Sequence, residues 1–401
     1  MNTLTLILSI LGMVYGLWFA VIAVTGSFLK CPRPERARKE LRFAVVVPAR
    51  NEAAVVGHLV RSLMSQSYPR EKYDVFVIPN GCADNTAGVA RAAGARVIEC
   101  TEQTHSKGDV LRFAFAEIPK VGTYDAYCIL DADNLAAPGF LRAANNYMNA
   151  GWEICQGYRD SKNPADNWIA GSTTVFFLFM NRFNNRSRMA LGMSAALNGT
   201  GIILRASLVE RIGWNVRSLT EDLEYSAICA LNGVKIGYAA DAVIYDEQPI
   251  GFRDSMVQRR RWFSGSMQCF RLLGWSLVKK HSLHAIDMLA VFFAWAIQIL
   301  TMIPGAFSLY VIVRAFLAGT LSVRNTLLVG AGMLFLSYLA CVLLAALVLG
   351  LEKKLSRRMI PTILLFPLFL LSWMPANLWA IITPPPKWTQ IVHVRSVDAP
   401  E

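Results

Sequence analysis

The 401-residue sequence has few of the features that mark metal clusters, disulfide frameworks or repeat proteins. Its eight cysteines are spread singly, without a CxxC pair, which argues against a zinc site or disulfide framework and fits a reducing compartment. The five histidines form no convincing metal-binding set. No internal repeat or low-complexity segment is present.

Charged side chains are missing from four long segments. These segments are Met1 to Leu29, Met288 to Val313, Thr326 to Leu351 and Met359 to Thr383. Each exceeds the roughly 20 residues that cross a hydrocarbon core. We predict an N-terminal transmembrane helix at 1–29, a retained anchor because no positive charge precedes its long apolar run. About three more are expected in 284–383, and Pro361, Pro367 and Pro375 predict that the last is broken or re-entrant.

The net charge of +12 invites a nucleic-acid interpretation, but many basic residues lie at the predicted membrane boundaries. They include Lys30, Arg33, Arg36, Arg38, Lys39 and Arg42 after the first span, and Lys353, Lys354, Arg357 and Arg358 between later ones. This positive-inside pattern predicts a multi-pass protein of the inner or plasma membrane whose catalytic domain is cytoplasmic and lies near anionic lipids. No ladder of basic and aromatic residues tracks a nucleic acid.

The segment 30–250 alternates in a strand–helix rhythm. Expected strands are Phe43 to Val47, Asp74 to Ile78, Arg96 to Glu99 and Tyr127 to Leu130, with helices over Glu52 to Gln66 and from Lys107. Such alternation predicts an α/β domain with a doubly wound, mostly parallel sheet, whose ligand lies beyond the carboxyl ends of the strands. Asn51, Asn80 and Asp131 would cluster there. Segment 251–283 mixes arginine with large apolar residues, which is typical of amphipathic interfacial helices.

Asp131 and Asp133 end an apolar strand, one residue apart. Two carboxylates in this position can bind a hard divalent cation and leave positions open for diphosphate oxygens. The alternative is a solvated turn.

Thr220, Glu221 and Asp222 precede an expected helix over Leu223 to Leu231. Asp222 could act as a general base near an acceptor hydroxyl, with Glu221 supporting the site. The alternative is an ordinary helix start, where a capping residue is followed by acids.

In the string Gln258-Arg-Arg-Arg261-Trp262, three residues share one helical face: Gln258, Arg261 and Trp262. A guanidinium and an amide can hold a departing diphosphate, and an indole can stack on a sugar or nucleotide. Arg259 and Arg260 are expected to point elsewhere, toward lipid phosphates. A juxtamembrane basic cluster is the alternative.

Two loops after successive strands carry polar groups suited to a uracil and a ribose. They contribute Pro48, Arg50, Asn51 and Glu52, and then Asn80 and Asp84. Lys107, at a helix start, could contact the nucleotide or its phosphate. For both loops the alternative is an ordinary turn. Trp388 lies in the Pro-rich tail, 384–401, where a tryptophan can simply be an interfacial anchor.

The order of these motifs resembles the inverting family-2 glycosyltransferases with a GT-A fold. The PARNE string, the Asn80 to Asp84 loop, KG, DAD, TED and QRRRW follow the family order with compatible spacing from about Phe43 to Phe270. With its flanking spans the chain is similar to the membrane-integrated branch, which includes cellulose, chitin and hyaluronan synthases and ceramide glucosyltransferase.

The resemblance implies a role for each matching position. Asp133 and Asp131 would hold Mg²⁺ or Mn²⁺ on the donor diphosphate, and Asp222 would be the catalytic base. The motif of Gln258, Arg261 and Trp262 would close over pyrophosphate and acceptor, and Trp388-Thr389 looks like the family's gating segment. One position departs from the pattern: Asn80 stands where the family has a uracil-recognising Asp. Asp84 matches a further acid of that pattern.

The expected function is therefore metal-dependent, inverting transfer of a hexose from a UDP-sugar. The motif set and the spans favour processive extension of a β-linked polysaccharide, with export through the chain's own spans. Transfer of one sugar to a lipid acceptor is the alternative within enzymes. A catalytically silent scaffold or transporter is the alternative of another class.

Overall fold

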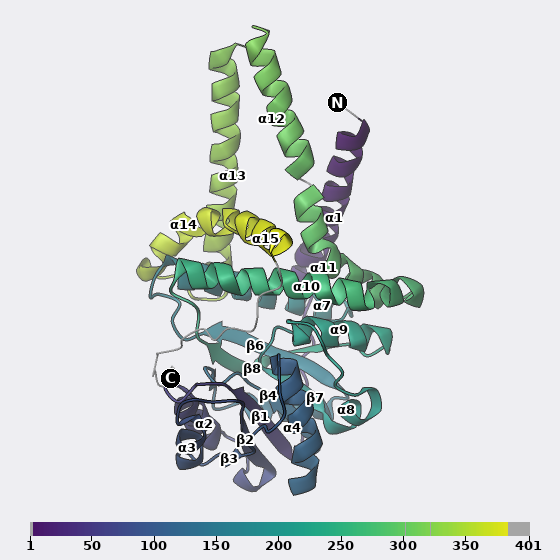
Figure 1. Ribbon diagram of the computed structural model, residues 1–401, viewed down its shortest axis with the longest axis vertical. Helices are drawn as coiled ribbons and strands as arrows, with labels where there is room; N and C mark the ends of the chain where they lie inside the picture. The colour runs from purple at the N-terminus through teal and green to yellow at the C-terminus, as the bar shows by residue number, and fades with distance from the viewer. Residues whose placement is uncertain (1–2, 301, 321, 384–401) are drawn as a thin grey trace.

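The computed structural model describes residues 3–300, 302–320 and 322–383. An eight-stranded sheet forms one end of the molecule, and apolar helices rise from the other (Figure 1). The strands are β1 Phe43–Ala49, β2 Tyr73–Pro79, β3 Arg96–Val97, β4 Ala126–Ile129, β5 Leu135–Ala136, β6 Ile154–Ser161, β7 Ile202–Arg205 and β8 Gly237–Asp246. The helices are α1 Thr3–Phe28, α2 Val56–Met64, α3 Thr86–Ala92, α4 Lys107–Val121, α5 Phe140–Asn149, α6 Trp168–Phe179, the π-helix η2 Met180–Arg186, α7 Ser187–Ala190, α8 Ala206–Ile212, α9 Glu221–Leu231, α10 Phe252–Lys280, α11 Leu283–Leu300, α12 Met302–Leu317, α13 Val323–Leu351, α14 Ile360–Leu371 and α15 Trp373–Ile382, with short 3₁₀ turns at Arg70–Lys72 and Arg357–Met359.

The strands lie in the order β3-β2-β1-β4-β7-β6-β8-β5. The strands β3, β2, β1 and β4 pair in parallel, as predicted, and so do β6 and β8. However, β7 pairs antiparallel with β4 and with β6, and β5 pairs antiparallel with β8, so the sheet is mixed rather than mostly parallel. Between β6 and β7 the chain passes through α6, η2 and α7, and the loop 191–201 then leads into β7 in the direction opposite to β4 and β6.

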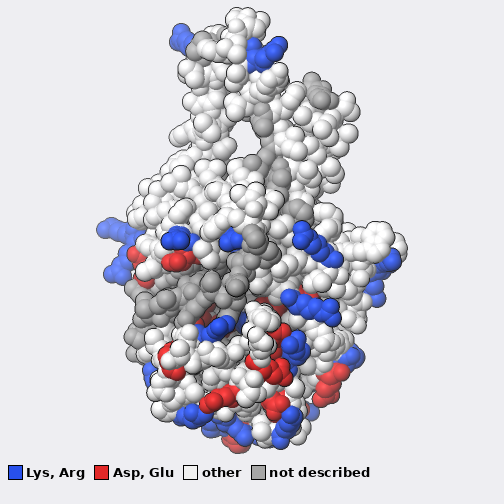
Figure 2. All heavy atoms as spheres, viewed as in Figure 1, with Lys and Arg blue, Asp and Glu red and all other residues white. Residues whose placement is uncertain are grey.

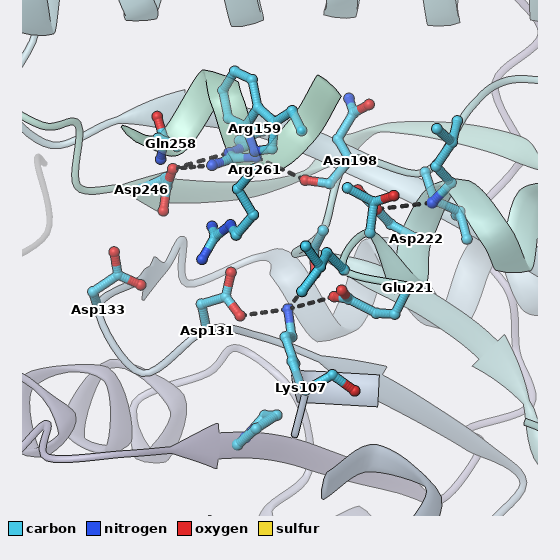
Figure 3. Close-up of a pocket in the computed structure, with 18 of the residues that line it drawn as sticks. Lys107, Asp131, Asp133, Arg159, Asn198, Glu221, Asp222, Asp246, Gln258 and Arg261 are labelled. Atoms are coloured by element: carbon cyan, nitrogen blue, oxygen red, sulfur yellow. Dashed lines mark hydrogen bonds and ion pairs between the residues drawn. The ribbon is translucent and has the colours of Figure 1, made fainter. Parts of the chain in front are cut away.

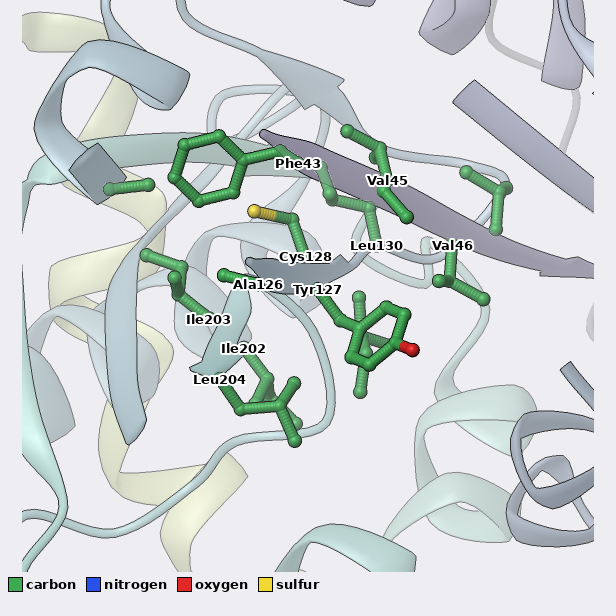
Figure 4. Packing of buried hydrophobic residues seen from close by; sticks show 14 of the residues in the cluster. Phe43, Val45, Val46, Ala126, Tyr127, Cys128, Leu130, Ile202, Ile203 and Leu204 are labelled. Carbon is green, nitrogen blue, oxygen red and sulfur yellow. The ribbon is translucent and has the colours of Figure 1, made fainter. Parts of the chain in front are cut away.

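The centre of the sheet is fully buried. Phe43 and Val45 of β1 pack with Cys128 of β4 and Ile203 of β7 between the surrounding helices (Figure 4). Both faces of these strands are covered, which explains why β1 reads as a continuous apolar run. The predicted strand bounds agree within two residues, but the first helix begins only at Val56.

Among the described residues, three segments are long and apolar enough to cross a membrane by length and composition: Thr3–Phe28, Thr326–Leu351 and Arg357–Ile382. The third is broken at Ser372 between α14 and α15: α15 packs along α10, whereas α14 packs against α6 and the base of α13 (Figure 1). Figure 2 shows that the α12–α13 hairpin is almost free of charged atoms between its tip and its base. The predicted division into domains stays a prediction.

A buried ion pair docks α1 onto the rest of the molecule. Arg188 of α7 donates to both carboxylate oxygens of Asp287 on α11, at 3.0 and 3.1 Å. Trp18 of α1 donates its indole N–H to the same carboxylate at 3.1 Å. Asp287 therefore joins three helices that lie far apart in the sequence.

The Asp287→Ala variant should lower the free energy of unfolding by about 3–5 kcal/mol, because Arg188, 2% exposed, would keep its charge without its carboxylate partner. Thermal unfolding in detergent micelles measures the effect. The control is Glu99→Ala, which removes the exposed Arg91–Glu99 pair and should cost about 0–1 kcal/mol. Equal losses in the two variants would contradict the docking role of Asp287.

Candidate active site

A cavity of about 340 Å³ lies between the carboxyl ends of β1, β2 and β4 and the helices α6, α9, α10 and α11. One wall carries residues predicted to contact the donor: Pro48, Arg50, Glu52, Asn80, Lys107, Asp131 and Asp133. The opposite wall carries Glu221, Asp222, Gln258, Arg261 and Trp262. The fold thus brings together motifs separated by more than a hundred residues in the sequence.

Lys107 lies between the two walls (Figure 3). Its Nζ is 2.5 Å from Asp131 Oδ1 and 3.3 Å from Glu221 Oε1, and it donates to the carbonyl of Gly199 at 2.6 Å. Burial alone would lower the pKa of Lys107, but the carboxylates of Asp131 and Glu221 hold it above its usual value. Lys107 is therefore a permanent positive charge at the centre of the site.

Asp222 stands at the first turn of α9, with Oδ1 accepting a hydrogen bond from the backbone N–H of Leu223 at 2.8 Å. Burial, and then the neighbouring charge of Glu221, raise the pKa of Asp222 to about 7. A carboxylate with a pKa near neutrality accepts a proton more effectively than an ordinary aspartate does. This property separates Asp222 from the acids of an ordinary helix start.

Gln258, Arg261 and Trp262 face the cavity together from α10, as their spacing predicts. In the described part of the chain Arg261 has no ion-pair partner, and its guanidinium points from α10 toward Asp131 (Figure 3). Trp262 packs in an aromatic cluster with Phe176, Phe177 and Trp373, at centroid distances of 5.8–6.1 Å.

Arg259 and Arg260 do not face lipid phosphates, contrary to the expectation. Arg259 is 1% exposed, and its Nη1 donates to Ser372 Oγ at 2.7 Å and to the carbonyl of Phe369 at 3.2 Å. Arg260 donates to Thr383 Oγ1 at 2.8 Å. Arg259 thus joins α10 to the break between α14 and α15, and Arg260 joins it to the residue that follows α15.

Two of the predicted donor residues lie outside the cavity wall and shape the loops instead. Asn51 has a left-handed backbone (φ 55°), and its side chain accepts from the N–H of Ala83 at 2.7 Å. Asp84 accepts from the N–H of Ala53 at 3.0 Å, which joins the two loops. Trp388 and Thr389, the proposed gating residues, lie outside the described residues.

The described residues contain no group of three or more His, Cys, Asp and Glu that could hold a metal ion by themselves. Asp131 and Asp133 nevertheless offer two hard carboxylate ligands on the cavity wall. They fit an Mg²⁺ or Mn²⁺ ion that takes its remaining ligands from a diphosphate and water.

A further cation of the site, Arg159, lies toward the carboxyl end of β6 and was not predicted. Its Nε donates to Asp246 Oδ2 at 2.9 Å and its Nη1 to the carbonyl of Asn198 at 2.7 Å. Asp246 also accepts from Asn134 at 2.8 Å. No sequence signal distinguishes Arg159, because a single arginine in a strand has no pattern around it.

The loop from Asn198 to Gly201 also contributes to the cavity wall and was not predicted, although its sequence is typical of a turn. Gly199 and Gly201 have positive φ values of 84° and 68°, and a Cβ on Gly199 would lie 3.6 Å from Asp222 Oδ2. The run Asn198-Gly-Thr-Gly201 is a typical turn sequence, which could have been placed near the site.

Part of the cavity wall is apolar. It is formed by Met180 of η2, Leu219, Leu223 of α9 and Val291 of α11, beside the aromatic cluster around Trp262. η2 and α11 also pack against α1, so this wall continues toward an apolar candidate membrane span.

The family described as Glycosyltransferase like family 2 matches residues 41–265, the segment that forms both walls up to α10. The chain belongs to this family. A mannosyltransferase from Pyrobaculum calidifontis, solved in complex with GDP-Man and Mn²⁺, is 18% identical and covers 94% of this chain and 98% of its own, with a TM-score of 0.61. The family match and the shared fold identify the architecture as GT-A.

Curated relatives match the same part of the chain. A probable glycosyltransferase of Bacillus subtilis, YdaM, is 22% identical over 248 residues, covering 59% of this chain and 58% of its own length. A Beta-monoglucosyldiacylglycerol synthase of Synechocystis is 24% identical over 273 residues, covering 63% and 54%. The chain thus spans somewhat more than half the length of these relatives.

The Asp222 carboxyl should titrate near pH 7, so that it is protonated below this pH and charged above it. The Glu221→Gln variant should lower this pKa, because it removes the negative neighbour that raises it. The carboxyl ¹³C shift of aspartate-labelled protein, assigned with Asp222→Asn, measures both values. A wild-type midpoint near 4, the ordinary value for an aspartate, would contradict the electrostatics inferred for the site.

Proposed function

We propose that this chain is a metal-dependent, inverting glycosyltransferase that transfers a hexose from a nucleotide-diphosphate sugar to an acceptor hydroxyl. The observation that carries the proposal is the placement of charge along the cavity. Asp131 and Asp133 lie on the donor wall, Asp222 with its raised pKa lies on the other, and Arg261 reaches between them.

In the proposed reaction Asp222 removes the acceptor's proton as the acceptor oxygen attacks the anomeric carbon. The bond between that carbon and the diphosphate oxygen breaks, and a single displacement turns an α-linked donor into a β-glycoside. Arg261 stabilises the charge of the leaving nucleoside diphosphate, and Lys107 holds Asp131 and Glu221 in place. Asp131 and Asp133 would hold Mg²⁺ or Mn²⁺, which neutralises further diphosphate charge.

The donor would enter beside Pro48, Arg50, Glu52 and Asn80, which line the first wall. The Mn²⁺ and GDP-Man of the Pyrobaculum structure support a metal and a sugar nucleotide in this fold. UDP-sugars are the first donors to test. GDP-sugars follow, because Asn80 can present either an oxygen or an N–H₂ group to a base. Asn51 and Asp84 would act by shaping the loops.

For the acceptor we favour a lipid that carries a hydroxyl group. The apolar side chains of Met180, Leu219, Leu223 and Val291, which line the same cavity as Asp222, cannot form hydrogen bonds with a sugar chain but suit an alkyl chain. The Synechocystis relative, a Beta-monoglucosyldiacylglycerol synthase by name, supports this choice. Processive extension of a β-linked polysaccharide, favoured by the motif resemblance, is the second candidate, because Trp262 and its aromatic neighbours could stack on sugar rings.

We further propose that the protein is embedded in the cell membrane with the sheet domain in the cytoplasm. The ends of α1 and α13 nearest the sheet are followed by the basic residues Lys30 and Arg33, and Arg357 and Arg358. The α14–α15 segment would be re-entrant, which leaves residues 384–401 on the cytoplasmic side. A silent scaffold is disfavoured, because the acids and Arg261 surround one cavity.

The Asp222→Asn variant should lose at least about 100-fold in transfer rate, because an amide cannot accept the proton. Release of UDP or GDP from a panel of sugar nucleotides, with Mn²⁺ and total membrane lipid as acceptor, measures the rate. Asp241→Asn, on an exposed carboxylate paired only at the surface, is the matched control and should keep wild-type activity. Undiminished transfer by Asp222→Asn would disprove the base assignment.

Purified protein supplied with radiolabelled donor and vesicles that contain diacylglycerol should yield a lipid with a single sugar. Mass analysis of the product measures its length, and a ladder of longer sugars would favour the polysaccharide candidate instead.

Val291→Asn should lower kcat/KM for the lipid roughly 10-fold while the donor KM stays unchanged, because the polar side chain interrupts the apolar wall.

A further inference from the structure

The loop that leads into Asp222 is held by the helix that carries the QRRRW string. The backbone N–H of Leu219 donates to Gln268 Oε1 at 2.9 Å, and the thiol of Cys269 donates to Ser218 Oγ at 3.2 Å. Gln268 and Cys269 lie on α10, two turns after Trp262. The loop therefore takes its position from α10 as well as from the sheet domain.

Gly265 marks the closest approach of α10 to this loop. A Cβ on Gly265 would lie 2.5 Å from both Oγ1 and Cγ2 of Thr220, the residue that immediately precedes Glu221 and Asp222. Glycine inside a helix costs about 1 kcal/mol relative to alanine, so a glycine in the middle of a 29-residue helix calls for a packing reason. The contact with Thr220 supplies it.

The residues that touch the loop lie on the same side of α10 as Arg261 and Trp262. Gly265 is four residues after Arg261, and Gln268 and Cys269 follow three and four residues after Gly265, so one helical face carries both groups. The buried side chain of Arg259 fastens α10 to Ser372. One straight helix thus bears the groups that face the leaving diphosphate and sets the place of the base.

We propose that Gly265, Gln268 and Cys269 form a clamp that fixes the distance between Arg261 and Asp222. The three are positioning residues: they touch neither donor nor acceptor, and they act through the loop 217–220. The inference rests on the glycosyl-transfer reaction proposed above, since it concerns the placement of that reaction's base.

The Gly265→Ala variant should lower kcat for transfer about 10- to 100-fold, because an added methyl group must push Thr220, and with it Asp222, away from α10. The dissociation constant for UDP with Mn²⁺, measured by calorimetry, should change less than about twofold. Gly332→Ala is the control: it is also a helical glycine, on α13, with nothing within 4 Å of its added Cβ. The pair Gly265→Ala/Thr220→Gly should recover most of the lost kcat, because it removes the clash.

Gln268 gives a second test that adds no bulk at the contact. Gln268→Leu should lower kcat about 10-fold by leaving the Leu219 N–H without its acceptor, while Gln268→Glu, which keeps an acceptor oxygen, should retain more activity. Wild-type kcat in Gly265→Ala and Gln268→Leu would overturn the clamp. So would a loss of UDP affinity equal to the loss of kcat. Absence of transfer in the wild type would instead reject the proposed function.

Discussion

The site depends on one buried cation. Lys107 reaches from the start of α4 to Asp131 after β4, to Glu221 at the start of α9 and to the carbonyl of Gly199. Lys107 and its three partners come from four separate stretches of the chain. Without a positive charge between them, the acids of the two walls would repel one another and the cavity would lose its shape. The same charge partly offsets the burial of Asp222, which keeps its pKa near neutrality.

The second constraint is mechanical and comes from α10. On one face this helix contributes Arg261 and Trp262 to the cavity and touches the loop before Asp222. On another face it is tied by Arg259 to the break between α14 and α15. A helix that lies between the sheet domain and the apolar helices can therefore hold these cavity residues at a fixed spacing. This placement gives a physical reason for a membrane-associated member of the family to keep its last motif on a long, amphipathic helix.

The cavity has polar and apolar parts, and both follow from the topology. Parallel strands deliver loops with Asn80 and Asp131 at their carboxyl ends, where sugar nucleotides bind in such sheets. The helices η2, α9 and α11 add the apolar side chains of Met180, Leu223 and Val291 to the wall that also carries Glu221 and Asp222. Asp222 is buried in this cavity beside Glu221, and for this reason its pKa is raised.

The sequence by itself determined the strand–helix order, the apolar segments and the motifs that contribute most of the charged groups of the cavity. These follow from local chemistry: buried strands are continuous apolar runs, and QxxRW places its key residues on one helical face. Only the tertiary structure decided that the sheet is mixed and that Arg259 is buried. It also decided that Asn51 and Asp84 form hydrogen bonds between the two loops and do not line the cavity. Arg159 and Gly265 could not be found from the sequence, because their roles depend on partners brought close by folding, Asp246 and Thr220. Long-range contacts of this kind have no periodicity along the chain, and so they appear only once the chain is folded.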